Sequence, residues 1–83
     1  MKRERDTSEY SKMMGRMLRA YGRRVGDADP EDLAEMLAVY AEFGAAIQAA
    51  VSAQREAHGT SWADIGRGAG ISKQAAQQRW GAK

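Results

Sequence analysis

The stretch from Pro30 to His58 constrains the fold most strongly, because its signals fit one long helix. Pro30 is the only proline of the chain, with Asp29 before it and two acidic residues after it. Aspartate is favoured at the N-cap, proline at the first helical position, and carboxylates near the positive end of the helix dipole. Gly59 suits the left-handed conformation that ends many helices. The sequence therefore predicts a helix over residues 30–58, about 42 Å long.

Apolar residues recur along this segment at alternating steps of four and three, the spacing of a coiled-coil-like contact. Gly44 interrupts the pattern and marks either a close helix approach or a bend. The apolar face of this helix is wide enough to contact more than one neighbouring helix. We expect it to pack partly on the preceding segment, through Tyr10, Met13 and Met17, and partly on a second copy. The predicted dimer-interface residues are Leu33, Leu37, Tyr40, Phe43 and Ile47.

A second amphipathic helix is predicted over residues 7–25, where Asp6 and Glu9 have the spacing of a capping box. Its apolar side is rich in tyrosine and methionine. The opposite side carries the cationic stripe, defined as Lys12, Arg16, Arg19 and Arg23. Three interpretations stay open: a solvated face paired with Glu35 or Glu42, an auxiliary phosphate contact, or a membrane-surface helix. The last is disfavoured, because bulky interfacial anchors are missing.

The last segment, residues 60–83, predicts two short helices. Ser61 and Asp64 form a capping signature that opens a helix over residues 62–68, and Gly70 ends it. Ser72 can cap a following helix over residues 73–80. No strand pattern is present, so we predict an all-α fold of one domain with four helices, a long central helix and a C-terminal helix-turn-helix.

The final helix has an unusual surface for its size. If Ala76 and Trp80 face inward, the outer face presents Lys73, Gln74, Gln77 and Gln78. Glutamine can pair with an adenine edge in the major groove, lysine can reach guanine, and an exposed Ala75 can touch a thymine methyl. Around this face, the predicted phosphate contacts are Thr60, Ser61, Arg67, Ser72 and Arg79, with Lys83 adding charge.

These residues carry a family resemblance over about a quarter of the chain. Ile65-Gly66, Ala69-Gly70-Ile71-Ser72, Ala76 and Trp80 resemble the helix-turn-helix of bacterial transcription regulators and of the last region of sigma factors. More loosely, the whole chain is similar to small DNA-binding proteins of high-GC bacteria and their phages. It departs from the pattern at Ala69, where leucine is usual, and at Gly66, where alanine is usual. We expect both changes to loosen the packing.

Composition excludes several classes of function. The chain has no cysteine and one histidine, His58, which we interpret as a helix-capping residue, so neither a thiol nucleophile nor a metal site can be assembled. We expect no enzyme activity, no cofactor and no small-molecule substrate. The start shows no secretory signal, and we expect no segment long enough to cross a bilayer and a cytoplasmic, nucleoid-associated location.

Charge is distributed unevenly: the net charge is +5 over residues 1–25, −6 over 26–58 and +3 over 59–83. Basic ends suit a polyanionic partner. The sequence predicts a homodimer that binds double-stranded DNA sequence-specifically and regulates transcription. The alternative is a protein-interaction module whose long helix binds polymerase or a phage or host protein.

Overall fold

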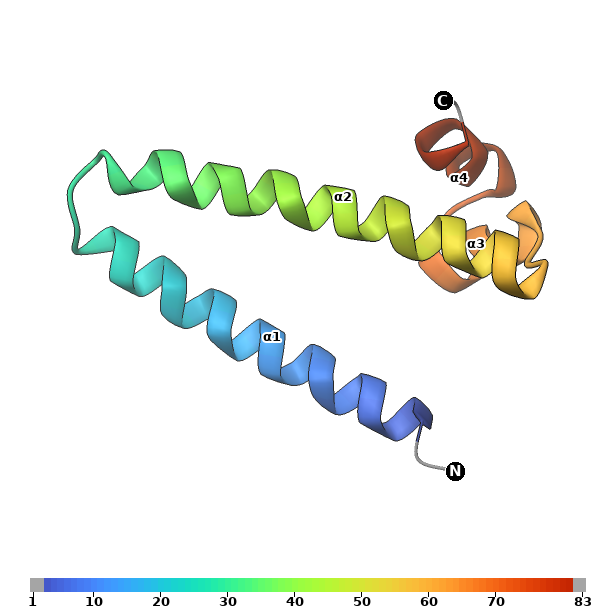
Figure 1. The fold of residues 1–83 in the computed structure, drawn as a ribbon, viewed down its shortest axis with the longest axis horizontal. Helices are drawn as coiled ribbons and strands as arrows, with labels where there is room; N and C mark the ends of the chain where they lie inside the picture. Colours follow the sequence, from blue (N-terminus) through green and yellow to red (C-terminus); the bar gives the residue numbers. More distant parts are fainter. Residues whose placement is uncertain (1–2, 82–83) are drawn as a thin grey trace. The chain divides into compact units, whose positions relative to one another are not determined.

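The computed structural model describes residues 3–81, and the surroundings of side chains from residue 6 onward. Four helices follow one another in this part of the chain, and no strand occurs in it (Figure 1). Their bounds are α1, Arg3–Gly26; α2, Asp32–His58; α3, Trp62–Ala69; and α4, Lys73–Trp80. The predicted all-α class with four helices is confirmed. Two compact units are present, Met1–Ala38 and Val39–Lys83. The single-domain interpretation stays a prediction.

The first helix begins earlier than its sequence signals indicate. α1 starts at Arg3, so Asp6 lies inside the helix, and the predicted capping box of Asp6 and Glu9 is wrong. Both carboxylates still lie in the first two turns, where the positive end of the helix dipole favours negative charge. At the other end, α1 extends to Gly26, one residue beyond the predicted bound of the helix.

A tight turn joins α1 to α2 inside the first unit. The backbone N–H groups of Asp27 and Ala28 donate to the carbonyl groups of Arg24 and Val25, which closes α1. The carbonyl groups of residues 29–31 then accept hydrogen bonds from residues three positions later. These bonds form a tight first turn, and α2 becomes regular at Asp32, two residues after the predicted start.

No side chain of the first unit is buried among its described residues. The half-buried side chains of α1 are Met14, Tyr21 and Val25, and Met36 of α2 is half-buried as well. Val25 and Met36 line one shallow depression with the turn that joins the two helices. The first unit therefore gains little from apolar burial, which is the main source of stability for helices in proteins.

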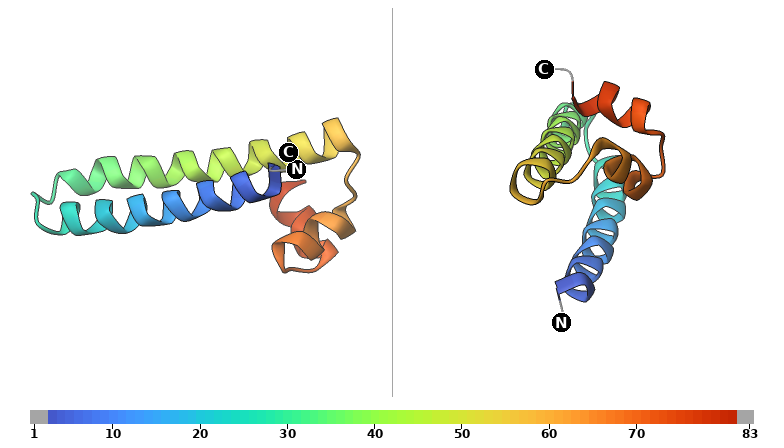
Figure 2. Two further views of the ribbon diagram at one scale, coloured as in Figure 1. Left: turned by 90° about the horizontal axis from the view of Figure 1, so that it is seen from below. Right: turned by 90° about the vertical axis from the view of Figure 1, so that its right-hand side faces the viewer.

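The hydrophobic core lies in the second unit. Val51 of α2 and Ile65 of α3 are each 8% exposed, and Ala76 of α4 is fully buried. Trp62, Ile71 and Trp80 pack around them, and the inward position expected for Ala76 and Trp80 is confirmed. Figure 2 shows α3 and α4 beside the C-terminal end of α2. The last third of α2 therefore contributes Val51 to the core that holds the two short helices.

The turn between α3 and α4 explains two glycines. Gly70 has a φ of +79°, and its N–H and that of Ile71 donate to the carbonyl groups of Arg67 and Gly66, as in a Schellman motif. A Cβ atom on Gly66 would lie only 2.8 Å from the carbonyl oxygen of Ile71. Gly66 therefore allows a close backbone contact, and the expectation that it loosens the packing is wrong.

The long helix α2 corrects one further expectation. By length and composition alone, it is the one helix in residues 3–81 that is apolar enough to cross a bilayer. The expectation that no segment reaches this length is wrong. The reason is that alanines fill the spaces between the large apolar residues, so that residues 36–54 contain a single charged side chain, Glu42.

Candidate nucleic-acid interface

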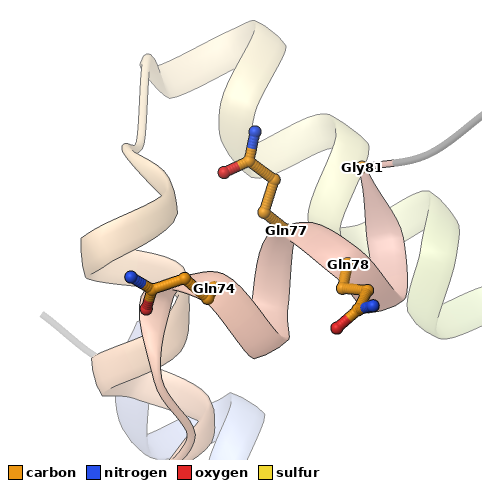
Figure 3. A pocket seen from close by; sticks show the side chains of 4 residues that line it. All are labelled: Gln74, Gln77, Gln78 and Gly81. Carbon is orange, nitrogen blue, oxygen red and sulfur yellow. The ribbon is translucent and has the colours of Figure 1, made fainter.

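The outer face of α4 carries four exposed polar side chains, as the sequence predicts. Lys73, Gln74, Gln77 and Gln78 are all exposed, and none makes a side-chain hydrogen bond or ion pair to another residue of the described chain. The three glutamines line an open depression together with Gly81. Figure 3 shows the amide groups extending away from the helix in different directions. This face is therefore free to bind an external partner.

The opposite side of α4 is fixed by packing and by its two ends. Ala76 is fully buried and Trp80 packs on the core. At the N-terminus, the hydroxyl of Ser72 accepts a 3.0 Å hydrogen bond from the N–H of Ala75. At the C-terminus, Nε2 of Gln48 in α2 donates a 3.0 Å bond to the carbonyl oxygen of Trp80. The exposed glutamines therefore lie on a helix that is capped at its N-terminus and held in place by the core and by Gln48.

A network on α3 engages two of the predicted phosphate contacts. The hydroxyl of Ser61 accepts a 3.0 Å bond from the N–H of Asp64, and Arg67 donates a 2.6 Å bond to the Asp64 carboxylate. The Arg67 hydrogen bond and charge, and then the Ser61 hydroxyl, lower the pKa of Asp64 below its usual value. The Arg67 side chain is still 75% exposed, so its guanidinium has further donors available.

Thr60 occupies the chain reversal between α2 and α3. Gly59 has a φ of +65°, as predicted, and its N–H donates to the carbonyl of Arg55. The hydroxyl of Thr60 donates to the side chain of Gln54 at 3.4 Å, and Arg55 donates to the Thr60 carbonyl at 3.1 Å. The Arg55 guanidinium also lies 4.3 Å from the centre of the Trp62 ring, a cation–π contact that no sequence pattern indicated.

The remaining predicted contacts around α4 have different positions. Arg79 is exposed, with its guanidinium 5.7 Å from the centre of the Trp80 ring. Ala75 is half-buried, so the expectation that it is exposed for a thymine methyl is wrong. Its place on the edge of the core follows from the neighbouring Ala76, which lies at the centre. Lys83 lies outside the described residues.

The predicted dimer-interface residues are all exposed. Leu33 is 51% exposed, Leu37 65% and Tyr40 76%; Phe43 and Ile47 are also exposed. The exposure extends to the residues of α1 expected to cover part of this surface, which are Tyr10, Met13 and Met17. Among the described residues of the second unit, no atom lies within 4 Å of a Cβ built on Gly44.

Lys12, Arg16, Arg19 and Arg23 of α1, the cationic stripe, are exposed. Glu35, one of the two carboxylates considered as their partners, makes no ion pair with them in the first unit. Among the described residues, no group of three or more metal-binding side chains occurs. No family model, no curated protein and no solved structure matches the chain.

Proposed function

We propose that this protein binds double-stranded DNA sequence-specifically, with α3 and α4 acting as a helix-turn-helix and α4 entering the major groove. One observation carries the proposal: the polar side chains of α4 are exposed and unpaired on a helix that the core holds in place. The major groove admits a helix, and a glutamine amide can both donate to and accept from an adenine edge. In this proposal Ser61, Ser72 and Arg67 contact phosphates: both serine hydroxyls accept a capping bond and keep an O–H to donate, and the Arg67 side chain is 75% exposed.

The protein acts as a homodimer in this proposal. One short recognition helix reads only a few base pairs, whereas a two-fold dimer places two such helices about 34 Å apart on successive turns of the groove. The exposed apolar residues of α2 supply a surface for the second copy. The role proposed for such a dimer is transcription regulation at the nucleoid in the cytoplasm, with no cofactor.

Base reading is tested with the Gln74→Ala, Gln77→Ala double variant. Duplexes selected by the full-length protein from a random library are compared with unselected duplexes by fluorescence anisotropy. We expect the double variant to lose about tenfold or more of its preference for selected duplexes, since each bidentate amide contact contributes roughly 1–3 kcal/mol of discrimination. Gln54→Ala is the matched control, because it removes an exposed glutamine of α2 and should leave the preference unchanged. An unchanged preference in the double variant would remove the assigned role of α4.

A protein-interaction module is the second candidate function, and the exposed apolar residues of α2 favour it. In that case, α2 binds a polymerase subunit or a phage or host protein, and the helix pair at the end is a scaffold. Salt dependence separates the two candidates. DNA binding weakens steeply with salt, because each neutralised phosphate releases counterions. A chain that binds no duplex even at low salt supports the interaction module instead.

A further inference from the structure

We propose that the cationic stripe of α1 is a second DNA-binding surface, one that contacts the phosphate backbone independently of base sequence. The inference rests on the proposed function, because it takes double-stranded DNA as the ligand. It adds a different site, in the first unit of the chain, and this site has a different role. The helix α4 selects the sequence, whereas α1 contributes affinity for any duplex.

The first argument is the charge of the helix. Residues 10–26 contain five arginine or lysine side chains and no carboxylate. The stripe residues Lys12, Arg16, Arg19 and Arg23 follow one another at steps of four, three and four, which places them on one face over about 16 Å. DNA carries one phosphate charge per roughly 3.4 Å of each strand, so this face is long enough to meet several phosphates.

The second argument is the shape of that face. Lys12, Arg16 and Arg19 line an open depression together with Ser8, Ser11 and Gly15. Because Ser8, Ser11 and Gly15 have small side chains or none, the helix backbone is accessible between the three cations. A guanidinium nitrogen of Arg19 lies 3.5 Å from the position that a Cβ on Gly15 would take. Two hydroxyl donors and three cationic side chains thus converge on a surface where a phosphate can approach the helix closely.

The third argument is that the first unit does not neutralise these charges. The described carboxylates of that unit are Asp6, Glu9, Asp27, Asp29, Glu31, Asp32 and Glu35, and none of them forms an ion pair with the stripe. The stripe residues are exposed along α1. Within the first unit, an external polyanion therefore does not compete with an internal ion pair for these cations.

Two features favour DNA over an anionic lipid surface. The half-buried residues Tyr21 and Val25 lie on the side of α1 opposite the stripe. That side is therefore partly covered by other residues of the first unit. α1 also contains neither tryptophan nor phenylalanine, the bulky anchors of many interfacial helices. Contacts from the stripe to phosphate oxygens would be independent of base sequence, because the phosphate backbone carries no direct sequence information.

The test measures salt dependence with full-length protein and an unselected duplex. We expect the triple variant Lys12→Gln, Arg16→Gln, Arg19→Gln to lower the slope of log affinity against log salt by about 2–3, since each phosphate contact contributes about 0.9. For single charges, Arg16→Gln is compared with Arg24→Gln. Both remove one exposed cation of α1, but Arg24 lies off the stripe, so only Arg16→Gln should lower the slope by about 0.9. Circular dichroism verifies that each variant stays helical.

The outcomes separate this inference from the proposed function. A triple variant with the wild-type slope overturns the role of α1 while DNA binding by α4 stands. Loss of sequence preference in the α4 double variant, together with the lowered slope in the α1 triple variant, supports both sites. Failure of the wild-type chain to bind any duplex overturns both. Binding to vesicles with about one-third phosphatidylserine tests an anionic membrane as the ligand instead. If the stripe variants lose vesicle binding but keep the wild-type salt slope for DNA, the ligand of the stripe is a membrane and not DNA.

Discussion

The side-chain amide of Gln48 donates a 3.0 Å hydrogen bond to the carbonyl oxygen of Trp80, across 32 residues of sequence. Gln48 lies in α2, one turn before the core residue Val51, and Trp80 is the last residue of α4. Carbonyl groups in the last turn of a helix have no partner within the helix. The bond therefore satisfies the end of α4 and fixes it to the helix that supports it.

Gln48→Ala should destabilise the second unit by about 0.5–1.5 kcal/mol, the usual net contribution of one hydrogen bond. Urea unfolding followed by tryptophan fluorescence measures the change, because Trp62 and Trp80 both lie next to the core. Gln54→Ala is the matched control, since its side chain makes only an exposed 3.4 Å contact. Equal losses of stability in the two variants would show that the bond to Trp80 has no special role.

Gly66→Ala should destabilise the fold by about 1–3 kcal/mol, because the new methyl group forces the backbone of the turn apart. The Cβ would lie 2.8 Å from the carbonyl oxygen of Ile71 and 2.9 Å from that of Ser72. Gly68→Ala is the control within the same helix, where a Cβ meets nothing within 4 Å. It should stabilise α3 by up to about 1 kcal/mol through helix propensity. Chemical denaturation distinguishes the two, and a stable Gly66→Ala variant would contradict the close approach.

Asp64 should make the folded state sensitive to acid. Its pKa is lowered in the folded protein, chiefly by the hydrogen bond from Arg67. A lowered pKa means that the contribution to stability is complete above the ordinary value of 3.8 and disappears as the pH falls through the folded-state value. The urea midpoint, measured between about pH 5 and pH 2, should fall less steeply in Asp64→Asn than in wild type.

Arg67→Gln removes the main cause of that shift, so it should flatten the acid profile in the same way. Its double variant with Asp64→Asn should add no further change, because both substitutions remove one interaction. If the urea midpoints of wild type, the two single variants and the double variant change in parallel with pH, the pair of Asp64 and Arg67 has no effect on folding stability.

Tyr40→Glu should shift the proposed dimer toward monomer. Tyr40 is 76% exposed, so a carboxylate there costs the isolated chain little, whereas a dimer contact would bury the charge. Sedimentation equilibrium measures the mass, and the melting temperature of wild type should rise with protein concentration. Ala45→Glu is the control, because Ala45 is exposed on the side of α2 away from the apolar residues. A wild-type mass equal to that of one chain would remove the dimer from the proposal.

The sequence by itself determined the helices and most of their ends. Pro30 acts through its fixed φ, and Gly59 and Gly70 act through their freedom to adopt a positive φ. Ser61 and Ser72 cap helices through backbone N–H groups three residues away. Such signals are local, so they can be found without knowing the fold. The exposed face of α4 was predictable for a related reason: once Ala76 and Trp80 face the core, helical geometry places the glutamines outside.

Only the tertiary structure decided features that depend on distant residues. The bond from Gln48 to Trp80 joins positions far apart in sequence, and the close approach at Gly66 depends on where the next turn runs. The start of α1 was misjudged, because the spacing of a capping box also occurs inside a helix, where Asp6 and Glu9 lie. Leu33 and Leu37 of α2 stay exposed within the first unit, since periodicity shows that a face is apolar and does not show what covers it.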